Sequence, residues 1–126
     1  MTDTELRDIR EWAAKVCGYS GCIDGGEAWY VPQPTNVPWR RCIRKDQWLP
    51  DQNIAQAFEV AEAVMRSGEL PHFDLHCMSP SRRWSAHIEF GFEKPGGKSV
   101  GGHASDESCC RAILLAARQA HAALSK

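Results

Sequence analysis

The residue types best suited to chemistry alternate with apolar residues in two neighbouring segments, 72–78 and 83–92. A histidine beside a carboxylate can bind a metal ion or transfer a proton, because imidazole titrates near neutral pH. The side chains concerned are His72, Asp74, His76, His87 and Glu89. Whether they act together depends on which of them share one face of a sheet.

The turn between the two segments sets their register. Alternation with a period of two predicts a β-strand in each segment. If residues 79–82 form a four-residue hairpin loop, Asp74 lies opposite His87 and His72 lies opposite Glu89. The apolar side chains then share the other face, which helices can cover. A slip of one residue would bury every polar group, so the pattern specifies this register.

These pairs also have a purely structural interpretation, since cross-strand pairs of opposite charge stabilise an exposed sheet face on their own. The sequence adds neither a nucleophile nor a third fixed ligand, and its six cysteines include no Cys-x-x-Cys pair. We therefore predict no catalytic residues, no metal ion and no cofactor. A metal or small-molecule site on the His/acid face of the sheet is kept as an alternative.

A second candidate site is the basic and aromatic segment 39–48. Arginine interleaved with tryptophan is typical of protein-binding hot spots, and it also suits stacking on single-stranded nucleic acid. The alternative is that the rings are buried while the cations stay solvated. Both hold if buried rings fix a segment whose cations face a partner. The predicted partner-binding residues are Trp39, Arg40, Arg41, Arg44, Lys45 and Trp48.

Three helices must position these segments. Apolar residues at helical spacing predict helices over 3–17, 52–67 and 106–124. The expected N-caps are Thr2 for the first helix, Asp51 or Asn53 for the second and Ser105 for the third.

The rest of the chain is expected to be extended or irregular. Residues 19–50 combine tryptophans with frequent prolines, which forbid a long helix but still favour an ordered excursion. Short extended pieces are expected near 28–31 and 39–44. A third strand near 98–104 follows a turn, and hairpin-length turns make the three-strand meander antiparallel.

The chain has 126 residues, with 15 basic and 16 acidic side chains and a net charge of −1. This length predicts a single domain over 1–126, comprising the helix 3–17, the excursion 19–50 and a helix-meander-helix core over 51–124. We expect neither a secretory signal nor a membrane span, and hence a cytoplasmic protein. In a reducing compartment the cysteines behave as small apolar residues, with a Cys17–Cys22 disulfide as the alternative.

The order of these elements resembles the phage ABA-sandwich domain family of small phage and prophage proteins. The resemblance rests on a helix that begins Asn53-Ile54-Ala55-Gln56-Ala57-Phe58-Glu59-Val60. It also rests on the Ala-rich helix after Ala104-Ser105-Asp106-Glu107-Ser108-Cys109-Cys110-Arg111-Ala112. It covers about residues 5 to 122. It implies an α+β fold, a three-layer α/β/α-type sandwich with a small, mostly antiparallel sheet, and it carries no activity to transfer.

The resemblance implies a phage-encoded accessory protein in the cytoplasm of a bacterial host. Together with the segment 39–48, it predicts non-catalytic binding to a host or phage protein, and an anti-CRISPR-like anti-defence inhibitor is the most concrete form. Nucleic-acid binding is possible but not favoured. Residues 52–124 share the helix, three-strand, helix order of double-stranded RNA-binding domains, yet acidic residues 106 and 107 stand where that family carries basic ones.

Overall fold

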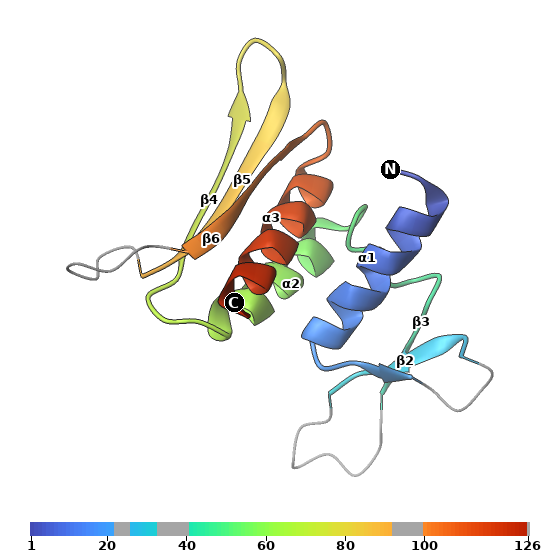
Figure 1. Cartoon of the computed structure of the whole chain (residues 1–126). Coiled ribbons are helices and arrows are strands. Elements are labelled where there is room, and N and C mark those ends of the chain that lie inside the picture. The colour runs from blue at the N-terminus through green and yellow to red at the C-terminus, as the bar shows by residue number, and fades with distance from the viewer. Residues whose placement is uncertain (22–25, 33–40, 92–99, 126) are drawn as a thin grey trace. The chain divides into compact units, whose positions relative to one another are not determined.

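A computed structural model describes residues 1–21, 26–32, 41–91 and 100–125 (Figure 1). The described residues form three helices and two antiparallel three-stranded sheets, so the α+β class predicted from the sequence is confirmed. The chain divides into two compact units, Met1–Leu49 and Pro50–Lys126. The boundary coincides with the predicted start of the helix-meander-helix core. The single-domain organisation of the chain stays a prediction.

The N-terminal unit opens with helix α1 (Asp3–Val16). Thr2 and Glu5 form the predicted capping box: the Thr2 hydroxyl accepts from the Glu5 amide at 3.1 Å, and the Glu5 carboxylate accepts from the Thr2 amide at 3.1 Å. Each bond satisfies an amide that the first turn of a helix leaves without a partner. Gly18, at φ 84°, follows the end of the helix in a conformation that suits glycine.

A small sheet follows, with the order β1-β2-β3: β1 (Ser20–Gly21), β2 (Ala28–Tyr30) and β3 (Cys42–Arg44). Strands β2 and β3 lie within the extended pieces expected near 28–31 and 39–44. They pair antiparallel with Trp29 opposite Ile43. The two-residue strand β1 was not predicted, because so short a segment has no periodicity to detect.

Trp48 anchors the end of this unit. Its side chain is 1% exposed, its indole Nε1 donates to the Arg10 carbonyl at 2.9 Å, and its ring centroid lies 4.8 Å from that of Tyr19. The bond joins residues 38 positions apart and ties the chain after β3 to α1. Buried aromatic rings therefore order a segment whose prolines forbid a long helix.

The C-terminal unit contains helix α2 (Ile54–Arg66), strands β4 (His72–Met78), β5 (Arg83–Phe90) and β6 (Val100–Asp106), and helix α3 (Cys109–Leu124). The strands form an antiparallel meander in the order β4-β5-β6. Asp74 pairs with His87 and His72 with Glu89, so the register predicted from the hairpin loop is confirmed. Of the two N-caps considered for α2, the structure has Asn53, whose side chain accepts from the Gln56 amide at 3.1 Å.

Both helices of this unit lie on the same face of its sheet (Figure 1). The Phe58 ring on α2 lies 5.9 Å from that of Phe73 on β4, and α3 packs closely on β6 and β5. This unit therefore has two layers, a sheet and a layer of helices. The implied three-layer sandwich stays a prediction, because the remaining described helix, α1, belongs to the other unit. The fully buried core residues include Val60, Val64, Ile88, Ile113 and Leu114.

The start of α3 corrects one expectation. Ser105 was predicted to cap a helix beginning at 106, but β6 continues to Asp106, which pairs with Trp84. Ser108 is the N-cap, and its hydroxyl accepts from the Arg111 amide at 3.3 Å. Pairing with β5 therefore extends the strand past a serine that could also have capped a helix.

Candidate functional site

The face of the β4-β5-β6 sheet opposite the helices carries most of the predicted chemistry-bearing residues. We call it the histidine face. The register places on it His72, Asp74, His76, Ser85, His87, Glu89 and His103. Strand alternation puts all seven side chains on one side, because residues paired across an antiparallel sheet point the same way.

Two His/carboxylate contacts on this face run along single strands. The His76 Nδ1 atom lies 3.7 Å from Asp74 Oδ2 on β4, and the His87 Nε2 atom lies 3.9 Å from Glu89 Oε2 on β5. Asp74 and His76 are more than half exposed, whereas Glu89 is largely covered. The sheet thus brings together the residues that the sequence singled out, but at distances of weak, solvated pairs.

The structure adds a Ser/His pair that the sequence did not indicate. The Ser85 hydroxyl and His103 Nε2 lie 2.7 Å apart, and the His103 amide donates to the Gln119 side chain at 3.1 Å. Ser85 is only 2% exposed, so its hydroxyl is closed to a substrate and the pair joins β5 to β6. Sequence reasoning missed it because the connection over 91–99 is too long to fix a hairpin register.

The alternative of a metal site was tested against these positions. Among the residues that the structure describes, no group of three or more His, Cys, Asp or Glu side chains is placed to hold a metal ion. A stable zinc site needs three or four such ligands converging on one point. The geometry of the described histidine face therefore does not support the alternative site at His72, Asp74, His76, His87 and Glu89.

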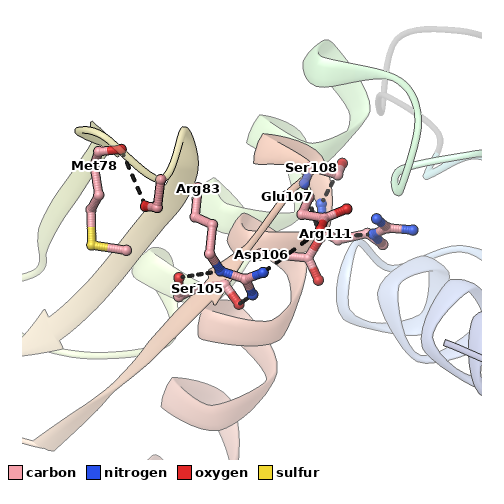
Figure 2. A network of polar contacts seen from close by, with 8 residues as sticks. Met78, Arg83, Ser105, Asp106, Glu107, Ser108 and Arg111 are labelled. Atoms are coloured by element: carbon pink, nitrogen blue, oxygen red, sulfur yellow. Dashed lines mark hydrogen bonds and ion pairs between the residues drawn. The ribbon is translucent and has the colours of Figure 1, made fainter.

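A polar network joins the end of the sheet to α3 (Figure 2). One Asp106 oxygen accepts from the Ser108 amide at 2.9 Å and from Arg111 Nε at 3.0 Å. Arg83 on β5 donates to the Ser105 carbonyl at 3.3 Å. Burial raises the pKa of Asp106, but the Ser108 amide bond and the Arg111 guanidinium outweigh it, so the net pKa lies below the ordinary value. All the groups involved serve one another, which makes this network structural.

The basic and aromatic segment 39–48 is partly described. Trp39 and Arg40 lie outside the described residues, whereas Arg41, Arg44, Lys45 and Trp48 lie within them. Trp48 is the buried anchor of the unit, so its predicted contact with a partner is corrected: in this structure its ring is enclosed by its own chain.

The cations of this segment are held by the β2-β3 ladder. The Val31 amide donates to the Arg41 carbonyl at 2.9 Å, and the Lys45 amide donates to the Glu27 carbonyl at 2.9 Å. Pairing thus continues beyond both ends of β3. We call the two residues Arg41 and Lys45 the basic ridge, because strand alternation places both on one side.

The two sides of β3 differ in charge. Arg44 lies on the side opposite the basic ridge, and its Nε and Nη2 atoms each lie 3.1 Å from an oxygen of Asp46. Lys45 lies over the Trp29 ring, with Nζ 4.6 Å from the ring centroid. Trp29 is buried and the Arg41 side chain is exposed. The carboxylate therefore offsets the charge of Arg44, whereas the basic ridge rests on a buried indole.

The described cysteines occupy different environments. Cys77 on β4 is exposed, whereas Cys110 in α3 is buried. Burial, followed by its neighbour Cys109, raises the pKa of the Cys110 thiol to about 11. Such a thiol stays protonated and behaves as a small apolar group. Cys22 lies outside the described residues, so the Cys17–Cys22 alternative stays a prediction.

Comparison with known proteins adds no relative: no family model matches the chain, and neither the curated proteins nor the solved structures give a match. Among the described residues no helix is both long enough and apolar enough to cross a membrane. The resemblance to the phage ABA-sandwich domain family remains a prediction from the sequence.

Proposed function

We propose that the protein acts by non-catalytic binding of a partner protein, and that the basic ridge contacts an acidic surface of that partner. The supporting observation is the way Arg41 and Lys45 are held. Both belong to a hydrogen-bonded strand ladder, and Lys45 rests on the buried ring of Trp29. Cations held on an ordered backbone lose little conformational freedom on binding, so more of their interaction energy appears as affinity.

The identity of the partner follows from the sequence resemblance and belongs to the same proposal. In the setting of a phage-encoded accessory protein, the partner is a host or phage protein in the bacterial cytoplasm. Inhibition of a host defence protein is its most concrete form. The negative charges of Glu27 and Asp46 near the ridge favour a folded acidic protein surface over a continuous phosphate backbone, which needs a longer basic track.

The experiment compares three proteins in a pull-down from nuclease-treated bacterial lysate, followed by affinity measurement with the captured partner. They are the wild type, the double variant Arg41→Glu/Lys45→Glu and the matched control Arg44→Glu. The double variant is expected to bind at least about tenfold more weakly, because two favourable charge contacts become repulsive. The control reverses one charge on the opposite side of β3 and is expected to bind like the wild type.

Circular dichroism of each variant first establishes that the unit is still folded. Equal binding by the folded double variant would remove the basic ridge from the proposal. A set of partners that disappears on nuclease treatment would instead assign the segment 39–48 to nucleic-acid binding, which also predicts a steep loss of heparin retention with salt.

A further inference from the structure

Strand β4 lies at the edge of its sheet, and no described strand pairs with its outer side (Figure 1). An unpaired edge exposes a row of backbone donors and acceptors, which proteins usually protect with lysine, proline, a bulge or a very short strand. The seven residues of β4 include neither lysine nor proline, and all of them pair with β5 without a bulge. This edge is therefore open to another strand.

The direction of the backbone groups at this edge follows from β6. The His103 amide donates to the Gln119 side chain, so the backbone groups of His103 point away from β5. Backbone groups alternate in direction along a strand. The β5-β6 bonds are therefore made by pairs such as Ala86 and Ala104.

The same alternation extends to β4. Since the backbone groups of Ala86 face β6, those of His87 face β4 and meet its partner Asp74. The groups of Phe73, Leu75 and Cys77 then point outward at the free edge. Leu75 is the middle residue of the strand His72–Met78.

From these positions we infer that two copies of the chain pair through β4, antiparallel, with Leu75 opposite Leu75 of the second copy on the twofold axis. In this register all seven residues of the strand are paired. Leu75 exchanges two hydrogen bonds with its counterpart, and Phe73 exchanges bonds with Cys77 of the second copy. Asp74 of each copy then lies opposite His76 of the other. The interface is self-complementary, as a twofold dimer requires.

The charges on β4 select this register over its neighbours. A shift that centres the axis on Asp74 places two carboxylates opposite each other, and one that centres it on His76 places two imidazoles opposite each other. Either arrangement loses both Asp/His pairs, whereas the Leu75-centred register makes both. Asp74 and His76 have side chains 55% and 56% exposed, so both are accessible to a second copy.

The apolar side of β4 is also left incompletely covered. Phe73 and Leu75 are half-buried, and Cys77 is exposed. On α2, whose Phe58 ring contacts Phe73, the Phe58 side chain is 40% exposed and Ile54 is 42% exposed. A second β4 strand would extend the apolar sheet surface directly beside these residues and cover part of it. This gives a hydrophobic reason for the same pairing.

The test is the oligomeric state of the full chain, measured by sedimentation over a series reaching millimolar concentration. The wild type is expected to dimerise, and Asp74→Lys is expected to raise the dissociation constant by about tenfold, because two favourable pairs become repulsive. The double variant Asp74→Lys/His76→Asp restores opposite charges in its own homodimer and should recover the wild-type constant. Glu107→Lys, a charge reversal away from β4, serves as the control and should change nothing.

Mixing provides an independent check of register. The double variant pairs with itself but not with the wild type, since a mixed pair sets Asp74 of the wild type against the introduced aspartate and His76 of the wild type against the introduced lysine. A mixture of Asp74→Cys and His76→Cys should form a disulfide under mild oxidation, whereas neither variant alone should gain one. A wild type that stays monomeric throughout the series overturns the inference. So does a failure of the double variant to recover dimerisation, or free exchange between it and the wild type. None of these outcomes bears on the basic ridge.

Discussion

Asp106 shows how one carboxylate connects a strand to a helix. It is the last residue of β6, and a single oxygen accepts both from the Ser108 amide and from Arg111 (Figure 2). Its side chain is 21% exposed, which limits screening by solvent. We predict that Asp106→Asn lowers the free energy of unfolding by about 1 kcal/mol at pH 7, because a charge-assisted bond to Arg111 is lost.

The effect should depend on pH in a defined direction. The pKa of Asp106 is lower in the folded chain than its ordinary value of 3.8, so folding favours the ionised carboxylate. The stabilisation is fully present above the unfolded pKa and is lost as pH falls through the lower, folded pKa. Denaturant unfolding of wild type and Asp106→Asn should therefore converge in stability only in acid. Glu107→Gln, whose side chain is 81% exposed, should show no such dependence, and a constant gap at all pH values would contradict the assignment.

Single residues also show what a sequence can and cannot indicate. The pattern alone allowed Trp48 either to bind a partner or to be buried, and its enclosure depends on Tyr19 and on the carbonyl of Arg10, 38 residues away. Sequence spacing does not reveal so distant a contact. Likewise, Arg44 and Asp46 are close enough in sequence for a pair to be expected. Only the strand direction shows that this pair lies on the side opposite Lys45.

At the scale of elements, Gly102 determines how closely α3 approaches β6. A Cβ atom at this position would meet the Ala116 carbonyl oxygen at 2.2 Å and the Ala120 nitrogen at 2.6 Å. Both are backbone atoms, so the helix itself would have to move. We predict that Gly102→Ala lowers the free energy of unfolding by about 1–3 kcal/mol, the range typical of overpacking.

Equilibrium denaturation checks this prediction, with Gly21→Ala as the control. Gly21 has nothing within 4 Å of its added Cβ atom and does not have a positive φ, so its replacement should leave the midpoint unchanged. If Gly102→Ala unfolds at the wild-type midpoint, the close packing of α3 on β6 is not required for stability.

The elements were predictable where short-range patterns decide them. The loop over 79–82 is short, so alternation in the flanking segments fixed both strands β4 and β5 and their register. The β5-β6 pairing could not be derived, because a long connection leaves the register to the sheet itself. That pairing brings Ser85 to His103 and carries β6 past Ser105. For the same reason the start of α3 was predicted three residues too early, at 106 rather than Cys109.

At the scale of the whole molecule, the core residues of the C-terminal unit lie on elements that are near in sequence. Val60 and Val64 on α2, Ile88 on β5 and Ile113 on α3 are all fully buried. Composition and length had predicted one domain. They could not show that the excursion over 19–50 forms a sheet of its own with α1 in a separate compact unit, because two- and three-residue strands leave no periodic signal.

This division leads to a prediction about the separate parts. We expect a fragment over 50–126 to fold alone with a cooperative thermal transition, because its core and both of its helix N-caps lie inside it. Trp84 is its single tryptophan, so the fluorescence of that residue and near-ultraviolet circular dichroism report directly on the β4-β5-β6 sheet. A fragment over 1–49 is expected not to fold alone, because so short a chain buries too little surface to offset its conformational entropy. Loss of the cooperative transition in the fragment over 50–126 would show that the first 49 residues are part of its folding unit.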